Sequence, residues 1–292
     1  MSIPKPVILD ISEHQMPSGI NYDKLAGAID GVIIRIQYGS HYLDKHYKTH
    51  IAAFQKRGIP VAVYAWIRGI NKADMEQEAV DFYNRAKAYN PVMWWLDVEE
   101  QSMGDMRGGT DAYRNKLKSL GAKKVGVYVA NHLYSQFNLD MSKFDGIWIP
   151  TYGSNNGQYN GSNPTATSNY NLHQYTSNGR LAGYNGPLDL SRIAKGKFSD
   201  FFGTTTANKP STPPITGGKI KMKTLTLNSN VYLRTAAKKS ASSISLLKKG
   251  SKVQFNDVVL ADGYIWAVQP RTDKHKLGYI AIGKIDTYGS VK

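Results

Sequence analysis

Short apolar runs recur along the first 200 residues of the chain, separated by more polar segments. Their length and their content of β-branched and aromatic residues are typical of buried strands. The runs cover residues 7–11, 32–36, 61–66, 92–98, 125–130, 147–150, 171–175 and 188–190. Helix-like segments separate the first four runs, notably 47–57 and 74–88, and this alternation predicts a parallel α/β sheet.

The second half of this region departs from that alternation. Residues 152–170 are rich in Gly, Asn, Ser, Thr and Pro, and they hold too few apolar side chains for a helix that packs on a sheet. We therefore predict a distorted or incomplete (β/α) barrel whose second half has lost helices. In such a fold the chemistry lies at the carboxyl ends of the strands.

A Pro-, Thr- and Gly-rich segment at residues 203–218 is typical of a linker. After it come short alternating segments broken by Gly and Asp-Gly, which predict a small all-β barrel. These segments are 231–234, 252–255, 264–269 and 277–282. We therefore expect a domain over residues 1–202, a linker over 203–218 and a second domain over 219–292.

Composition adds two constraints. The chain has no cysteine, so disulfides and thiolate zinc sites are excluded and stability has to come from packing. The net charge of +15 is concentrated at the end, where residues 219–292 hold 14 basic and 4 acidic residues, a net charge of +10. This charge predicts an anionic partner, and teichoic acids, nucleic acid and membrane surfaces all meet that requirement.

The beginning of the chain enters a strand-like stretch without a charged segment followed by an apolar one, and no apolar run approaches the length of a membrane span. We therefore expect neither an export signal nor membrane insertion.

The motif Met93-Trp-Trp-Leu-Asp-Val-Glu-Glu100 carries the sharpest chemical signal. Side chains alternate in a strand, so Trp95, Asp97 and Glu99 share one face, and the apolar face packs on helices. The two carboxylates stand about 7 Å apart at Cα. Like charges so placed raise one pKa, which gives the protonated acid and ionised partner that glycosidic cleavage needs. The alternative is a solvated pair, or one neutralised by a nearby arginine.

Two further carboxylates lie at strand ends. Asp10 ends the first apolar run and Asp189 ends the last. The first and last strands of a closed barrel are neighbours, so Asp10, Asp97, Glu99 and Asp189 are expected to converge on one rim.

At these positions the sequence resembles the glycoside hydrolase family 25 lysozymes, over about residues 5–195. The matching motifs are Asp10-Ile-Ser-Glu-His-Gln15, Trp95-Leu-Asp-Val-Glu99, Val125-Gly-Val-Tyr-Val129, Ile147-Trp-Ile-Pro-Thr-Tyr152, Leu172-His-Gln-Tyr-Thr176 and Asp189-Leu-Ser191. The resemblance implies an N-acetylmuramidase that splits the β-1,4 bond between N-acetylmuramic acid and N-acetylglucosamine. It implies no metal and no organic cofactor.

By the same resemblance, Glu99 matches the general acid and Asp97 its partner, while Asp10 and Asp189 match rim carboxylates. Asp97 would steady positive charge or position the substrate's acetamido group. A second-carboxylate or acetamido nucleophile would retain configuration, whereas a water activated by Asp10 or Asp189 would invert it. The sequence leaves this choice open.

Aromatic side chains are the second ingredient of a sugar site, because sugar rings stack on flat apolar faces. Six lie at or just beyond the ends of the predicted strands, and together they favour a sugar groove over core positions. They are Tyr64, Trp66, Tyr128, Trp148, Tyr152 and Tyr175. We also expect Arg35 to pair with a rim aspartate. The histidines His14, His132 and His173 are interpreted as structural, since their spacing does not suggest a zinc site.

Residues 226–286 resemble bacterial SH3-type (SH3b) wall-binding domains. The matching pieces are Asn230-Val-Tyr-Leu-Arg234, Gly263-Tyr-Ile-Trp-Ala-Val268 and Gly278-Tyr-Ile-Ala281. The resemblance implies binding to peptidoglycan stem peptides or cross-bridges. The candidate contacts are Tyr232, Arg234, Tyr264, Trp266 and Tyr279. The alternative is that these aromatic side chains fill the core of the small barrel.

These observations predict a phage-type endolysin, made in the host cytoplasm without a signal peptide and acting on the wall after release. Its expected partners are peptidoglycan and, through the basic tail, teichoic acids. Nucleic acid and membrane are not expected, although the tail lysines could also track phosphates. A non-catalytic wall binder would be expected to have lost Asp97 or Glu99. A chitinase-like enzyme lacks support, because a single Asp precedes Glu99 at the expected spacing.

Overall fold

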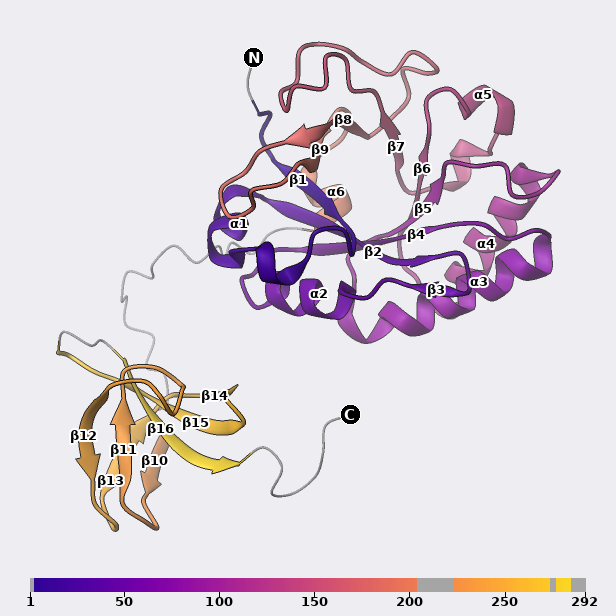
Figure 1. The fold of residues 1–292 in the computed structure, drawn as a ribbon. Coiled ribbons are helices and arrows are strands. Elements are labelled where there is room, and N and C mark those ends of the chain that lie inside the picture. Colours follow the sequence, from indigo (N-terminus) through magenta and orange to yellow (C-terminus); the bar gives the residue numbers. More distant parts are fainter. Residues whose placement is uncertain (1–2, 204–222, 274–276, 285–292) are drawn as a thin grey trace. The chain divides into compact units, whose positions relative to one another are not determined.

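The computed structural model describes residues 3–203, 223–273 and 277–284, in two compact units, Met1–Thr212 and Pro213–Lys292 (Figure 1). The boundary falls within the predicted linker, of which every residue but Gly203 lies outside the described residues. The expectation of a barrel followed by a small β-domain is confirmed. Among the described residues, no helix is long and apolar enough to cross a membrane.

Eight strands of the first unit form a closed barrel, because β1 pairs with β2 at one side and with β9 at the other. Neighbouring strands are parallel except at β9, which is antiparallel to both β1 and β8. The strands, each of which overlaps a predicted run, are β1 (Ile8–Ile11), β2 (Gly31–Tyr38), β4 (Val61–Trp66), β5 (Trp94–Val98), β6 (Val125–Val129), β7 (Ile147–Pro150), β8 (Leu172–Gly179) and β9 (Leu188–Ile193). A two-residue strand, β3 (Tyr42–Leu43), pairs antiparallel with the end of β2.

The barrel of strands is closed, but the layer of helices around it is incomplete. The helices are α1 (Tyr22–Ala28), α2 (Tyr47–Gln55), α3 (Lys72–Ala86), α4 (Met106–Leu120), α5 (Tyr134–Phe137) and α6 (Phe198–Phe202), with short 3-10 turns at Pro17–Gly19, Lys87–Tyr89 and Met141–Lys143. Residues 151–171, all of them described, contain no helix between β7 and β8, as predicted. Asn131 Oδ1 accepts backbone N–H bonds from Thr165 and Ala166 instead, so polar side chains order this loop.

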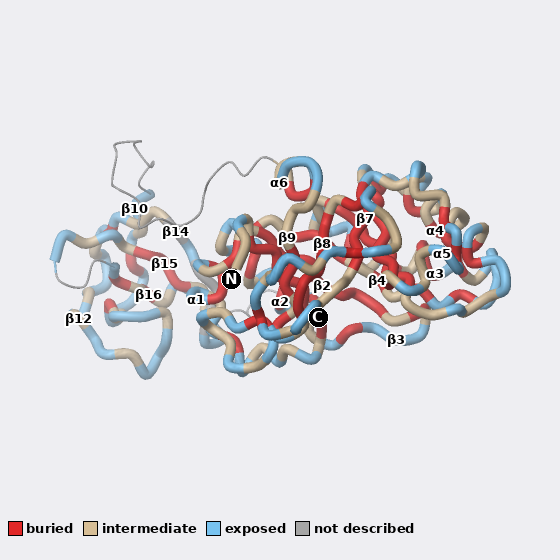
Figure 2. Tube along the Cα trace, turned by 90° about the horizontal axis from the view of Figure 1, so that it is seen from above, coloured by how far each residue is buried: buried red, intermediate tan, exposed pale blue. Residues whose placement is uncertain are grey.

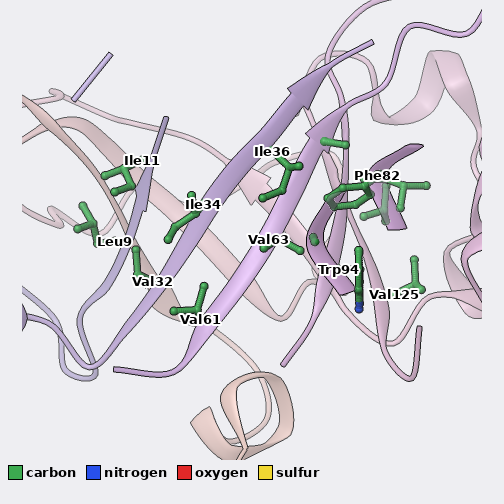
Figure 3. Packing of buried hydrophobic residues seen from close by; sticks show 14 of the residues in the cluster. Leu9, Ile11, Val32, Ile34, Ile36, Val61, Val63, Phe82, Trp94 and Val125 are labelled. Atoms are coloured by element: carbon green, nitrogen blue, oxygen red, sulfur yellow. The ribbon is translucent and has the colours of Figure 1, made fainter. Parts of the chain in front are cut away.

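Alternation along the strands divides the core into two layers. One layer lies between the barrel and its helices, where Figure 3 shows Leu9, Ile34, Val63 and Trp94 among its members. The other fills the barrel and includes Trp95. Figure 2 shows the strands as the most continuously buried part of this unit. Each fully buried large apolar side chain contributes about 1.5–3 kcal/mol, so these layers fix the barrel on which the strand ends are placed.

The second unit consists of two antiparallel sheets around a small core. One sheet pairs β10 (Lys223–Thr226) with β13 (Lys252–Phe255). The other has the order β12 (Ser243–Leu247), β11 (Val231–Arg234), β16 (Leu277–Lys284), β15 (Tyr264–Pro270) and β14 (Asp257–Ala261). Leu227, Leu233, Val253, Ala267 and Ile280 form the core.

Candidate active site

A cavity of about 260 Å³ opens at the carboxyl ends of the barrel strands, and all four predicted carboxylates line it. Asp10 lies in β1, Asp97 in β5, Glu99 one residue beyond β5 and Asp189 in β9. The complete lining is Asp10, Ser12, His14, Arg35, Tyr64, Trp66, Asp97, Glu99, Tyr128, Trp148, Tyr152, Gln174 and Asp189.

Strand alternation places the β5 carboxylates as the sequence predicted. Trp94, Leu96 and Val98 belong to the layer beneath the helices, whereas Trp95 packs inside the barrel. Asp97 and Glu99 continue the inward series and reach the cavity. Closure brings in the other two carboxylates, because Asp10 and Asp189 are direct partners in the register of β1 and β9.

Burial dominates the electrostatics of Asp97 and Glu99. It raises the pKa of Asp97 well above its usual range, and the charge of Glu99 adds to that rise. Burial also raises the pKa of Glu99. Two ionised carboxylates are therefore disfavoured in this pair, and burial favours a form that keeps a proton. Oδ1 of Asp97 is buried and has no hydrogen-bond partner among the described residues. This oxygen can therefore accept a hydrogen bond from a molecule bound in the cavity.

The second pair behaves in the same way. Burial, followed by the charge of Glu99, raises the pKa of Asp189 to about 7. Burial and the charge of Asp189 raise the pKa of Asp10 well above its usual range, while a hydrogen bond from Gln174 opposes the rise. The cavity can therefore hold protonated and ionised carboxyl groups together, as general acid–base chemistry requires.

Among the described residues, no group of three or more His, Asp or Glu side chains could hold a metal ion.

The sequence of this unit matches the model of the glycosyl hydrolases family 25 over residues 9–184. The chain belongs to this family. Its curated relatives include the autolytic lysozyme of Clostridium acetobutylicum, 26% identical over 193 residues, which are 64% of this chain and 56% of the relative. The match thus spans little more than half the length of that relative.

Solved structures of related proteins share this barrel. A glycosyl hydrolase 25 of Streptococcus pneumoniae, GHIP, described as a virulence factor participating in host cell invasion, is 41% identical with a TM-score of 0.65, covering 68% of this chain and 93% of its own. The catalytic domain of endolysin ply40, from bacteriophage P40 of Listeria monocytogenes, is 27% identical with a TM-score of 0.61, covering 66% and 95%.

Five of the six predicted aromatic residues line the cavity of this family 25 barrel, namely Tyr64, Trp66, Tyr128, Trp148 and Tyr152. The placement of Tyr175 at the rim was wrong. On β8, Leu172 packs inside the barrel and Gln174 lines the cavity, so Tyr175 points outward and is buried in the layer beneath the outer surface, 6.0 Å from the ring of Tyr159.

Arg35 lines the cavity, but its expected pairing with a rim aspartate was also wrong. Its Nε lies 3.1 Å from Oδ2 of Asp44, and its Nη2 lies 3.9 Å from Oε1 of Glu13. Asp44 follows the short hairpin strand β3, which the hydrophobic pattern did not reveal. Arg35 therefore lines the cavity while its guanidinium is paired with Asp44 and Glu13.

Sequence reasoning missed three lining residues of the family 25 site, Ser12, His14 and Gln174. His14 was interpreted as structural, yet it is exposed and lines the cavity. Counting alternate positions from Leu172 would have found Gln174. His173 is buried on the outer face of β8, where its ring bonds the carbonyl of Thr151 at 2.8 Å, which fits the structural interpretation.

The candidate contacts of the second unit are unequally exposed. Tyr232 is 50% exposed, and the guanidinium of Arg234 lies 5.3 Å from its ring centre. Tyr264 and Tyr279 are half-buried. Trp266 is completely buried, so its assignment as a surface contact was wrong and the alternative of a core position holds for it.

Proposed function

We propose that this family 25 chain is a lysozyme that hydrolyses the β-1,4 bond between N-acetylmuramic acid and N-acetylglucosamine in peptidoglycan. The observation that carries the proposal is the convergence of Asp10, Asp97, Glu99 and Asp189 on one cavity walled by aromatic side chains. The similarity to an autolytic lysozyme and to the catalytic domain of an endolysin supports the same substrate.

In this proposal Glu99 is the general acid. It lies just beyond the end of β5 and is less buried than Asp97, so it is the member of the pair within reach of a glycosidic oxygen. Burial raises its pKa and keeps it protonated at higher pH than an ordinary glutamate. A positioned acid of this kind contributes about 10²–10⁴-fold to the rate.

Asp97 acts deeper in the cavity. Its unpartnered Oδ1 is suited to accept a hydrogen bond from the N–H of a substrate acetamido group. An acetamido group held in this way can attack the anomeric carbon through its carbonyl oxygen, which gives overall retention of configuration. Proton NMR of freshly released sugar ends tests this step, because the β-anomer must form first. First formation of the α-anomer would instead assign a water-activating role to Asp10 or Asp189.

Trp66 provides a fixed surface for a sugar ring. Its indole Nε1 donates to Oε1 of Glu100 at 3.1 Å, and Glu100 in turn pairs with Arg68. Its ring also packs 5.3 Å from that of Tyr38. A ring held from two sides loses little entropy when a sugar stacks on it, which favours binding.

The proposal is tested by the initial rate at which purified peptidoglycan releases reducing ends. Glu99→Gln keeps the size of the side chain and removes the acid, so the rate should fall by about 10²-fold or more. Glu76→Gln is the matched control, because Glu76 lies on the exposed side of α3 and pairs with Lys116. A wild-type rate for Glu99→Gln would remove Glu99 from the mechanism.

We further propose that the second unit is an SH3b-type domain that holds the enzyme on the wall, where it binds stem peptides or cross-bridges and, through its charge, teichoic acids. Tyr232, its cross-strand neighbour Leu246 and Arg234 support this proposal, because two of them are half-exposed apolar side chains beside a cation. We also propose that the enzyme acts on the wall after release from the host cytoplasm. Fractionation of expressing cells before and after lysis tests that route.

A further inference from the structure

Gln174 makes four hydrogen-bonding contacts at the wall of the cavity. Its Oε1 accepts the hydroxyl of Tyr128 at 2.9 Å and the hydroxyl of Tyr152 at 2.8 Å. Its Nε2 lies 3.0 Å from Oδ1 and 3.1 Å from Oδ2 of Asp10. The side chain is buried, and it reaches from β8 past β9 to β1 inside the barrel. One amide thus links β8 to β1, to β6 and to the loop after β7.

The chemistry of the amide fixes the direction of these bonds. If the amide were turned over, Oε1 would face both oxygens of Asp10, and acceptor would meet acceptor whenever Asp10 is ionised. With the observed orientation the N–H₂ group faces the carboxylate, and both tyrosine protons are committed to Oε1. The hydroxyl oxygens of Tyr128 and Tyr152 can then accept hydrogen bonds from a bound molecule but cannot donate one.

We propose that Gln174 is a positioning residue that gives this wall one hydrogen-bonding polarity, holding both oxygens of Asp10 as oriented acceptors and leaving Tyr128 and Tyr152 as acceptors toward the substrate. The substrate group that meets this wall must therefore be a donor, a hydroxyl or an amide N–H. A carbonyl or a carboxylate placed there would face three acceptors. The role of this wall in turnover rests on the proposed lysozyme function. The hydrogen bonds of Gln174 do not depend on that function.

The surroundings of Asp10 make such a residue necessary. The acidic groups facing Asp10 are Asp189 from β9 and Asp97 and Glu99 from β5 and its end. The hydroxyl of Tyr64 from β4 faces it as well. Arg35 from β2 and His14 from the loop after β1 line the same cavity, and Arg35 is already paired with Asp44. Gln174 thus donates to both oxygens of Asp10, which lies among three carboxyl neighbours.

The test is the titration of Asp10, followed by carboxyl carbon chemical shifts in protein labelled at aspartate and assigned with Asp10→Asn. Gln174→Met keeps the length of the side chain and removes the donor, so the midpoint of Asp10 should rise by about one pH unit or more. Gln174→Glu still accepts both tyrosine protons but adds a charge, and it should raise the midpoint as well. It serves as the second variant if Gln174→Met does not fold.

Gln37→Met is the matched control. Gln37 is an equally buried glutamine that donates to the carbonyl of Glu78 at 3.1 Å and accepts from Arg85 at 2.7 Å, away from the cavity. It should lower stability and leave the midpoint of Asp10 unchanged. An unchanged midpoint in the folded Gln174 variants would overturn the proposal. The readout needs no activity, so a wild-type protein that releases no sugar ends would refute the lysozyme function alone.

The rate profile gives a second readout. If Asp10 must be ionised for turnover, the fall in kcat/KM at low pH should move upward by the same amount in Gln174→Met and should not move in Gln37→Met. A merely structural loss would reduce the rate equally at every pH, and that result would contradict the assignment.

Discussion

At the scale of single residues, the site depends on carboxyl groups that burial keeps from ionising independently. The pKa values of Asp97, Glu99, Asp10 and Asp189 are all raised, with burial as the largest cause in each case. A raised pKa favours the neutral acid, so the cavity holds a proton donor at a pH where a surface glutamate has lost its proton.

This electrostatic arrangement predicts the alkaline side of the rate profile. The rate should fall as pH rises through the raised pKa of Glu99, because the general acid then loses its proton, with a midpoint above the ordinary value of about 4.5. An aryl glycoside whose leaving group needs no proton should show no such fall. A fall of the same size with both substrates would place the titrating group elsewhere.

At the scale of elements, the interior of the barrel depends on close approach between neighbouring strands. A Cβ at Gly126 of β6 would lie 2.4 Å from the ring of Trp95 on β5. Both residues are buried, so neither can move aside easily. Gly126 therefore allows Trp95 to fill the barrel beneath the cavity.

Gly126→Ala should lower the free energy of unfolding of the first unit by about 1–3 kcal/mol, as overpacking does in other cores. Urea unfolding followed by tryptophan fluorescence measures this change. Gly104→Ala is the control, since no heavy atom lies within 4 Å of a Cβ there. Equal stability of the two variants would show that the barrel relaxes around the added methyl group.

A second prediction concerns α3. Burial raises the pKa of Glu78 to about 7, although the carboxylate accepts the backbone N–H of Arg68. Its contribution to stability is therefore full below the unfolded pKa near 4.5 and is lost as pH rises to about 7, on the order of 3 kcal/mol. In Glu78→Gln this loss should disappear. Thermal unfolding at pH 5 and pH 8 checks it, with Glu76→Gln, at a partly exposed glutamate of the same helix, as control. If Glu78→Gln lost as much stability between pH 5 and pH 8 as the wild type, ionisation of Glu78 would not be the cause.

Much of this architecture could be predicted because strand burial leaves a local pattern. The apolar runs predicted the barrel strands. The alternation of side chains along a strand then placed Asp97 and Glu99 on the face that lines the cavity. The hairpin strand β3 left no such pattern, because Tyr42 and Leu43 are both exposed. The partner of Arg35, which follows that hairpin, was therefore missed.

Gln174 was missed for another reason. A glutamine has no charge to mark it, and its role depends on three residues that only closure of the barrel brings together. In the second unit, β10, β12 and β14 were not predicted, because polar residues such as Lys223 and Ser243 interrupt the apolar pattern of β10 and β12.

At the scale of the whole molecule, the chain joins two units. The first is a barrel whose cavity holds four carboxyl groups, and the second is a small basic unit with a core of its own. The family match covers residues 9–184 of the first unit. The proposed division of labour is cleavage by the first unit and attachment to the wall by the second.

Tyr232→Ser should separate these two tasks. Removing a half-exposed aromatic side chain should weaken sedimentation with purified walls by about tenfold, as hot-spot aromatics do in other interfaces, and leave the rate on soluble peptidoglycan fragments unchanged. Leu277→Ser, at a residue that is 40% exposed at the start of β16, is the control. Unchanged binding by Tyr232→Ser would remove this face from the wall contact.

The central claim is that Glu99 acts as the acid of a muramidase, and the identity of the sugar ends tests it most directly. Purified peptidoglycan is digested with wild type and with Glu99→Gln, reduced with borohydride and analysed by mass spectrometry. The account predicts reduced muramic acid from wild type and almost none from Glu99→Gln. Reduced glucosamine from wild type, or equal amounts of reduced muramic acid from both proteins, would contradict it.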